Sequence, residues 1–237
     1  MNVEMLERRR LLTVSVVQGY PGYYEVYGDE SPDVIAVAFS EADGTFTVNG
    51  ATYGGVAYVT IFGEGGDDSI DVGPAPWPIG VSASGGHGSD SIALNSAGGI
   101  WGDEGNDVLR LNNSFRGTVN GGSGDDRIYV AGDCIEPRID GDDGGDFIDA
   151  TGNNFGIFAH GGRGEDTVYG SNYDDEIYGD GGNDLLYGAA GNDVAYSVDQ
   201  QPDRVIGGAG IDTAFVDVGE AGVWGVEYVY YPSPAAA

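Results

Sequence analysis

Aspartate recurs at one fixed place in a nine-residue pattern, and this regularity is the strongest chemical signal in the chain. The pattern is Gly-x-x-x-x-Asp-x-U-x, where U is apolar, and it occurs eleven times between residues 28 and 215. A tight turn needs glycine or asparagine, but it does not need an acidic residue at the same place in every copy. Carboxylates stacked in successive turns would repel one another unless a cation lay between them. The pattern therefore predicts a series of metal sites.

The candidate metal ligands are the sixth-position carboxylates, together with one carboxylate from a degenerate copy at residues 198–206. They are Asp33, Asp68, Asp90, Asp107, Asp126, Asp146, Asp166, Asp175, Asp184, Asp193, Asp203 and Asp212. Carbonyl oxygens of the turns are expected to complete the sites, in the loops that begin at Gly63, Gly85, Gly102, Gly121, Gly141, Gly161, Gly170, Gly179, Gly188 and Gly207. Hard oxygen donors without His or Cys select calcium over zinc or copper, so we expect several calcium ions.

The residues around each aspartate predict short strands joined by turns. The eighth position is apolar in every copy, and a second apolar residue often follows two places later, as in Ile92-Ala93-Leu94 and Leu109-Arg110-Leu111. Residues two apart on a strand share a face, so these segments read as half-buried strands. Six residues, rich in glycine, separate one strand from the next and suit left-handed backbone conformations.

The repeats resemble the RTX family, the haemolysin-type calcium-binding repeats with the consensus GGxGxDxUx. The clearest copies run from Gly85 to Ala93, Gly121 to Tyr129, Gly161 to Tyr169 and Gly179 to Tyr187. The resemblance implies an all-β fold, a right-handed parallel β-roll or β-solenoid. It also implies two nonapeptides per coil, with calcium between loops that are stacked one coil apart.

The spacing of the copies assigns them to two edges of the roll. Successive starts at 85, 102, 121, 141, 161 and 179 are 17 to 20 residues apart, close to one coil, so these loops should stack on one edge with the loop at 63. The starts at 170, 188 and 207 should form a shorter row on the opposite edge. Between residues 85 and 161 that opposite edge has turns without the repeat, so we expect little or no metal there.

The remaining segments divide the chain into three parts. We expect an addressing or capping segment at 1–27, the β-roll at 28–218, and a C-terminal cap and tail at 219–237. Residues 36–62 interrupt the period, and their alternating segments 46–50 and 57–61 predict an inserted hairpin. Segments 214–218 and 226–231 are expected to be closing strands, since a solenoid needs atypical ends.

The N-terminus contains the one targeting signal that can be recognised. Residues 6–13, LERRRLLT, resemble the LEPR-XLL motif of exported or surface proteins, with Arg8 in place of the motif's proline. The resemblance implies an extracellular or cell-surface location. The alternative is a first strand that caps the roll. No run of 18 apolar residues predicts a membrane span.

Composition narrows the function classes. The net charge is −30 and all nine basic residues are arginine, which disfavours nucleic acid as a partner. The chain lacks an HExxH motif, and its two histidines, His87 and His160, lie in or beside repeat loops. We therefore predict a calcium-binding structural or surface module rather than an enzyme. A remote alternative is a polysaccharide-modifying enzyme on a parallel β-scaffold.

A second alternative is a calcium-dependent adhesin that binds a glycan or a cell-surface protein. The ninth repeat position follows the inward apolar residue, so its side chain should point outward. This position gives a possible partner face of Tyr129, Tyr169, Tyr178, Tyr187, Tyr196 and Phe215. We expect Tyr169 to lie over Tyr187 on one sheet, and Tyr178 over Tyr196 and Phe215 on the other.

Overall fold

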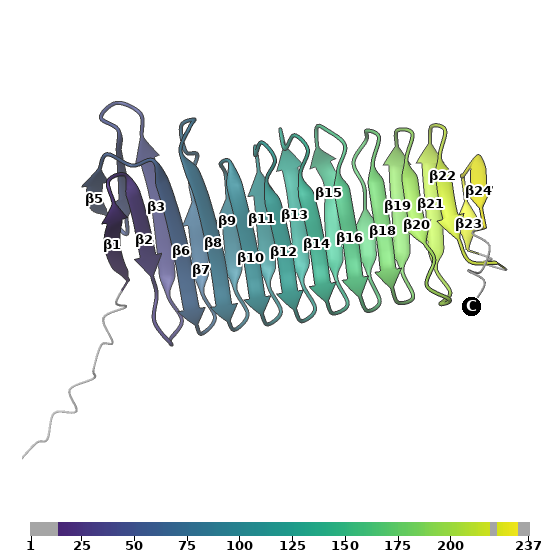
Figure 1. Cartoon of the computed structure of the whole chain (residues 1–237), viewed down its shortest axis with the longest axis horizontal. Coiled ribbons are helices and arrows are strands. Elements are labelled where there is room, and N and C mark those ends of the chain that lie inside the picture. The colour runs from purple at the N-terminus through teal and green to yellow at the C-terminus, as the bar shows by residue number, and fades with distance from the viewer. Residues whose placement is uncertain (1–13, 219–221, 232–237) are drawn as a thin grey trace, which may run out of the picture.

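A computed structural model describes residues 14–218 and 222–231, and it folds them into a long stack of two β-sheets (Figure 1). Each sheet has twelve strands, and the chain alternates between the sheets along most of its length. The regular elements of the described segments are all β-strands, and none of those segments forms a helix able to cross a membrane. The predicted all-β parallel solenoid is confirmed.

The first sheet, sheet A, contains β1 (Ser15–Tyr20), β2 (Tyr23–Tyr27), β6 (Tyr58–Gly65), β8 (Gly80–His87), β10 (Gly98–Glu104), β12 (Thr118–Ser123), β14 (Arg138–Asp143), β16 (Phe158–Arg163), β18 (Glu176–Gly181), β20 (Val194–Ser197), β22 (Thr213–Val216) and β24 (Tyr228–Tyr230). The second sheet, sheet B, contains β3 (Val34–Ser40), β4 (Thr45–Val48), β5 (Ala51–Gly54), β7 (Ser69–Val72), β9 (Ser91–Leu94), β11 (Val108–Asn112), β13 (Arg127–Gly132), β15 (Phe147–Asn153), β17 (Thr167–Tyr169), β19 (Leu185–Ala190), β21 (Arg204–Ala209) and β23 (Val223–Trp224).

The core is a column of aliphatic side chains between the sheets. Ile92, Leu109, Ile128 and Ile148 occupy the same register on β9, β11, β13 and β15, and each is fully buried. Each such side chain contributes roughly 1.5–3 kcal/mol by burial. Because strands pair one coil apart in parallel, the turns between them also stack, and the apolar eighth position thus fixes where the aspartates lie.

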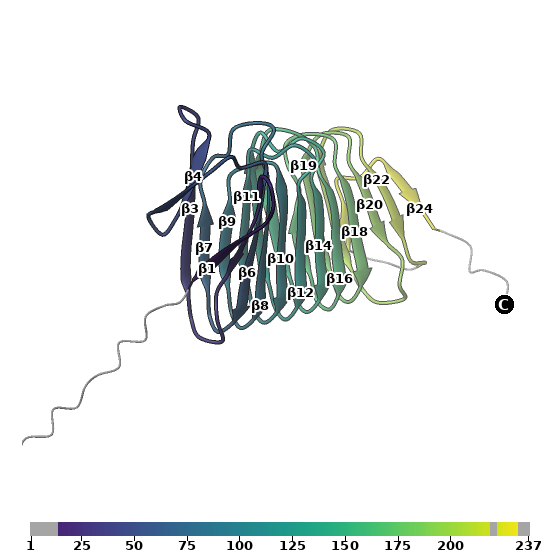
Figure 2. The same cartoon turned by 60° about the vertical axis from the view of Figure 1, so that its left-hand side comes forward.

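The N-terminal end is closed by antiparallel strands (Figure 2). Strand β1 pairs antiparallel with β2, so a capping strand is present here. The inserted hairpin consists of β4 and β5, which extend sheet B from β3. The segment 57–61 was expected to be part of this hairpin, but it belongs to β6, because Val59 and Ile61 are buried in the solenoid core. The motif at residues 6–13 lies outside the described residues.

The C-terminal end is formed by short parallel strands. Strand β24 pairs with β22, in agreement with the two closing strands expected near these positions. The two-residue strand β23 ends sheet B beside β21 and was not anticipated. The tail from residue 232 lies outside the described part.

Candidate calcium-binding edges

The sixth-position aspartates form one continuous row along the first edge, where the chain passes from sheet A to sheet B. In each step the Oδ1 atom of one aspartate accepts a hydrogen bond from the backbone N–H of the aspartate one coil earlier, over 2.7–2.9 Å. The row contains Asp33, Asp68, Asp90, Asp107, Asp126, Asp146, Asp166, Asp184 and Asp203. This order is the one that the 17- to 20-residue spacing predicts, and Asp203 of the degenerate copy continues it.

A shorter row lies on the second edge, where the chain returns from sheet B to sheet A. Asp175 accepts from the N–H of Ile157 at 2.8 Å, Asp193 from Asp175 at 3.0 Å, and Asp212 from Asp193 at 2.9 Å. The row ends on Glu227, whose Oε2 accepts the N–H of Asp212 at 2.8 Å. Sequence reasoning missed Glu227, because it stands outside any nonapeptide copy.

The second carboxylate oxygen of most row members is buried and unsatisfied. These aspartates are at most 3% exposed, and within the described chain their Oδ2 atoms have no hydrogen-bond partner. The set is Asp68, Asp90, Asp107, Asp126, Asp146, Asp166, Asp184, Asp193 and Asp212. A buried polar atom without a partner is costly, and a buried carboxylate oxygen is especially so.

Backbone carbonyls point to the same places as these unsatisfied oxygens. A Cβ atom added to Gly102 would lie 2.2 Å from Oδ2 of Asp107 and 2.3 Å from the carbonyl oxygen of Gly121 in the next coil. The same pair of contacts occurs at Gly121, with Asp126 and the Gly141 carbonyl at 2.3 and 2.6 Å. The first position must therefore be glycine, and it leaves a cradle lined by oxygen atoms of two successive coils.

Burial raises the pKa values of the row carboxyls. The pKa of Asp107 and of Asp146 is raised to about 7, and that of Asp126 to about 6, from the ordinary value of 3.8. Desolvation is the largest cause in all three, and backbone hydrogen bonds to the carboxylate oppose it. Asp184 and Asp193 are raised to about 7 for the same reason. Without a cation, burial thus disfavours the ionised form of these carboxyls, and a bound cation would favour it.

The donor set fits calcium. In the part of the chain that the structure describes, no three His, Cys, Asp or Glu side chains converge as a metal cluster; each nonapeptide loop supplies one buried sixth-position carboxylate. A cation in the cradles would therefore be held by row carboxylates together with turn carbonyls, an all-oxygen environment that calcium accepts readily. A bound ion would supply the positive charge that the buried row lacks. The assignment of individual aspartates as ligands stays a prediction.

Carboxylates at the ends of the rows differ from those inside them. Oδ2 of Asp33 accepts the N–H of Asp29 at 2.7 Å, and Asp175 accepts both the N–H and the hydroxyl of Ser171. Oδ2 of Asp203 accepts the hydroxyl of Ser197. Protein groups therefore satisfy Asp175 and Asp203 more fully, whereas Asp33 still has a buried Oδ1 atom without a partner among the described residues. All three were predicted as ligands on equal terms with the rest.

A second ladder beside the first was not recognised in the sequence. Side chains at the fifth repeat position accept hydrogen bonds from the backbone N–H at the fifth position of the next coil. Oδ1 of Asp67 accepts the N–H of Ser89 at 2.9 Å, and Oδ1 of Asp125 accepts the N–H of Gly145 at 3.0 Å. On the second edge Asp174 accepts from Asn192 at 2.7 Å. The signal was present as an Asp or Asn directly before the sixth-position aspartate. These side chains tie successive loops together without an ion.

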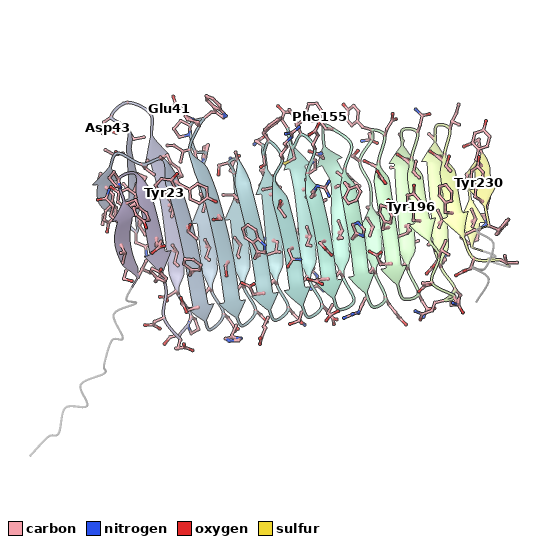
Figure 3. All side chains as sticks on the ribbon, viewed as in Figure 1. Tyr23, Glu41, Asp43, Phe155, Tyr196 and Tyr230 are labelled. Atoms are coloured by element: carbon pink, nitrogen blue, oxygen red, sulfur yellow. The ribbon has the colours of Figure 1, made fainter. Side chains whose placement is uncertain are left out.

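The ninth-position aromatics lie on the outer faces, as expected. Tyr169 pairs with Tyr187 in sheet B, and Tyr178 pairs with Tyr196, and Tyr196 with Phe215, in sheet A. On sheet A the rings are stacked and nearly parallel, with centroids 4.4 Å apart for Tyr178 and Tyr196 and 4.8 Å for Tyr196 and Phe215. Figure 3 shows Tyr196 and, at the end of the sheet, Tyr230. Such rings cover one another's faces and leave their edges outward.

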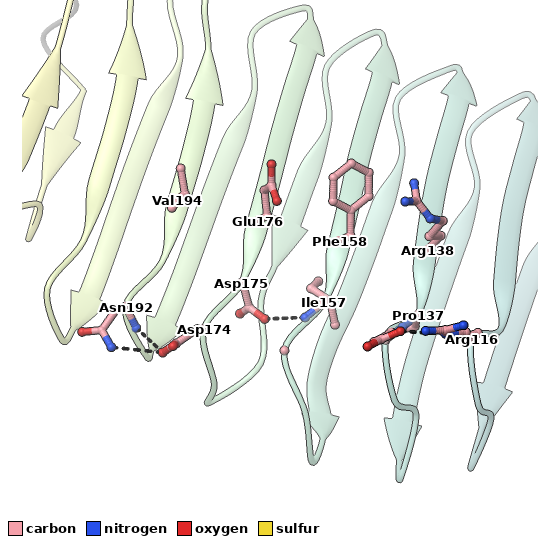
Figure 4. Close-up of a pocket in the computed structure, with 12 residues that line it drawn as sticks. Arg116, Pro137, Arg138, Ile157, Phe158, Asp174, Asp175, Glu176, Asn192 and Val194 are labelled. Atoms are coloured by element: carbon pink, nitrogen blue, oxygen red, sulfur yellow. Dashed lines mark hydrogen bonds and ion pairs between the residues drawn. The ribbon is translucent and has the colours of Figure 1, made fainter.

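A shallow cleft of about 770 Å³ lies on sheet A beside the second edge (Figure 4). Arg116 and Glu136 pair at its rim over 2.8 Å, and the guanidinium of Arg138 lies 4.8 Å from the ring centre of Phe158. The histidines lie elsewhere, with His87 against Glu104 and His160 against Asp180. These charged groups thus have neighbours of opposite charge or aromatic character, and the described residues that line the cleft include no serine, threonine, cysteine or lysine.

Together, the parallel coils, the glycine cradles and the buried oxygen rows define a β-solenoid built around repeated cation sites. The family model of the RTX calcium-binding nonapeptide repeat matches this chain in residues 53–74, 112–133 and 160–195. No curated protein sequence matches this one. These repeats indicate a calcium-binding β-roll protein.

Proposed function

We propose that the protein is an extracellular calcium-binding repeat module whose β-roll folds as calcium fills the loops, and that it serves as a structural or cell-surface element. The row of buried carboxylate oxygens without partners carries this proposal. Sites that do not exist in the unfolded chain convert metal binding into folding free energy. Extracellular modules commonly bind calcium at about 10⁻⁴ to 10⁻³ M, so such a chain would stay loose at cytosolic calcium and fold outside the cell.

The test is a calcium titration of chelator-treated protein, followed by circular dichroism and thermal unfolding. We expect β-structure and the unfolding temperature to rise with calcium, and magnesium at equal concentration to act weakly, because it demands a smaller and more regular site. An unchanged spectrum and unfolding temperature in chelator and in 10 mM calcium would refute the proposal.

The aromatic row on sheet B supports a second candidate, an adhesin that docks a glycan or a cell-surface protein. Here the rings are tilted, by 54° between Phe147 and Tyr169 and by 63° between Tyr169 and Tyr187, so they do not cover one another's faces as on sheet A. Tyrosine presents an apolar face and a polar tip suited to such contacts. Replacement of Tyr169 and Tyr187 by Ser should abolish binding to an immobilised glycan panel and to cells, with calcium-induced folding nearly intact. Loss of folding together with binding would assign the row to the fold alone.

A further inference from the structure

The turns of the second edge change character along the solenoid. Between β9 and β16 they are irregular, at residues 95–97, 113–117, 133–137 and 154–157, and none carries the nonapeptide. We call the coils of residues 91–157 the central coils. From residue 161 to 216, the C-terminal coils, both edges carry nonapeptide loops. The two regions therefore differ in how their second edge is closed.

In the central coils asparagine side chains, the exposed carboxylate of Asp133 and backbone groups close the second edge. The amide of Asn113 donates to Oδ1 of Asn95 at 2.9 Å, and its own Oδ1 accepts the N–H of Asp133 at 3.1 Å. Asn154 donates to Oδ1 of Asp133 at 2.9 Å. An asparagine side chain both donates and accepts, so it can continue such a ladder without adding charge.

Protein groups satisfy much of the interior of these irregular turns, although the buried hydroxyls of Ser96 and Ser114 have no partner among the described residues. Asn153 is 2% exposed, accepts the N–H of Cys134 at 3.1 Å and donates to the Cys134 carbonyl at 3.0 Å. The N–H of Ile135 donates to the Ser114 carbonyl at 2.9 Å. Small polar side chains thus stand at the turn, where the C-terminal loops have a buried carboxylate.

The C-terminal coils have acidic rows on both edges. Asp166 and Asp184 on the first edge and Asp193 and Asp212 on the second have Oδ2 atoms without a partner among the described residues. Each central coil has one such carboxylate, because its second edge has none. Figure 4 shows the junction, where the N–H of Ile157 meets Asp175.

The core becomes thinner in the same direction. On sheet A the inward register position holds Val119 and Ile139 in the central coils, but Ala195 and Ala214 near the end of the C-terminal coils. Smaller side chains bury less apolar surface, so these coils gain less stability from their core. Since each coil of a solenoid contacts only its neighbours, regions can differ in their local stability.

We propose that calcium selectively stabilises the fold of the C-terminal coils, while the asparagine hydrogen bonds of the second edge make the central coils much less dependent on calcium. This inference rests on the proposed calcium-driven folding and deepens it. The C-terminal coils have less intrinsic stability and one more carboxylate whose Oδ2 lacks a partner among the described residues. They have four, Asp166, Asp184, Asp193 and Asp212, against three in the central coils, Asp107, Asp126 and Asp146. Calcium removal therefore opens residues 161–216 first, together with the aromatic rows that they carry, and leaves the central coils as the more ordered base.

Hydrogen exchange of the full chain, read by mass spectrometry in chelator and in 10 mM calcium, tests this directly. A site with a dissociation constant near 1 mM gains a factor of about ten at 10 mM calcium. The one additional carboxylate should therefore raise protection in residues 161–216 about tenfold more than in residues 91–157. Equal gains in both regions would overturn the inference, whereas no gain in either region would overturn the proposed function itself.

Two variants sharpen the test. The double replacement Asn113→Ala and Asn153→Ala should lower the protection of the central coils in chelator to that of the C-terminal coils. Asn120→Ala, in the same coil but on the outer face of sheet A, where the half-buried amide donates to Asp142, is the matched control and should change little. If the double variant does not fold, Asp193→Asn with Asp212→Asn decides, because it keeps the Oδ1 acceptors and should reduce the calcium-dependent gain at 161–216 to the central value or below it. An unchanged gain in that variant would refute the inference.

Discussion

Replacement of Asp126 by Asn should have opposite effects on stability in the absence and in the presence of calcium. Oδ1 of Asp126 accepts the N–H of Asp107 at 2.7 Å, and an asparagine keeps this acceptor and the shape of the side chain. Oδ2 has no partner within the described residues and becomes an amide NH₂. The carbonyl of Gly141 converges on the same point above Gly121 and can accept from that amide. The variant therefore removes a buried charge and leaves no obvious orphan.

The magnitude without calcium follows from the burial of the carboxyl. Desolvation raises the pKa of Asp126 from 3.8 to about 6, so ionisation at neutral pH costs at most about 3 kcal/mol, taking ~1.4 kcal/mol for each tenfold change in proton affinity. Screening by solvent at the edge of the roll reduces this to roughly 1–2 kcal/mol. In chelator the variant should be more stable than the parent by about that amount.

With calcium the sign reverses, because the sites next to Asp126 lose a charged ligand. A tenfold loss of affinity corresponds to about 1.4 kcal/mol, and we expect at least that loss in the middle of the long row. Urea unfolding in chelator and in 10 mM calcium measures both effects. Asp125→Asn is the matched control: Asp125 is exposed, its Oδ1 accepts the N–H of Gly145, and its replacement should matter little in either condition. If Asp126→Asn were destabilised equally in both conditions, the buried carboxylate would not destabilise the calcium-free fold, and the reasoning would be refuted.

Three further predictions address pH, glycine and the aromatic rows. In chelator, lowering the pH from 8 to 5 should increase β-structure. Carboxyls such as Asp107 and Asp146 have folded pKa values of about 7, above their unfolded value of 3.8. Their contribution to the free energy of unfolding is therefore complete below about pH 4 and is lost as the pH rises through 7. Gly124→Ala should lower the free energy of unfolding, measured in urea, by about 3 kcal/mol or more. The backbone φ is +127° there, and the new Cβ would lie 1.9 Å from the carbonyl oxygen of Gly105 in the preceding coil. Gly54→Ala, where a Cβ would meet open space, is the control and should not destabilise the protein. Tyr196→Ser should lower stability in calcium by about 1–3 kcal/mol by removing two ring contacts, against little change for Tyr20→Ser, whose side chain is exposed.

The stacking order of the loops was predictable because one coil has a nearly constant length. Intervals close to 18 residues place successive aspartates in one row, and the register of the inward apolar residues enforces it. The inserted hairpin was predictable only in part. Asn49-Gly50 marked its turn, but the alternation of Tyr58 to Ile61 is the same in a hairpin strand and in a solenoid strand. Only the burial of Val59 and Ile61 against neighbouring coils distinguishes the two.

The closure of the irregular turns could not be predicted from local sequence. Asn95, Asn113 and Asp133 lie 18 and 20 residues apart, in segments that share no motif. Their side chains meet because the core strands on either side are in register, so the contact is a property of the stack. Glu227 escaped prediction for a related reason: it substitutes for an aspartate by geometry alone, at the end of the second row.

The two oxygens of each row aspartate divide the work of fold and function. Oδ1 accepts a backbone N–H in every coil, which holds successive loops together whether or not an ion is present. Oδ2 has a protein partner where a row begins or ends, at Asp33, Asp175 and Asp203, and lacks one among the described residues inside the rows. At Asp33 the unpartnered atom is Oδ1 instead, so this aspartate also has one oxygen free for a cation. A solenoid that satisfied all of these oxygens internally would need no cation in order to fold. Under the proposed function, the unsatisfied oxygens are the reason that folding of this chain follows the calcium concentration around it.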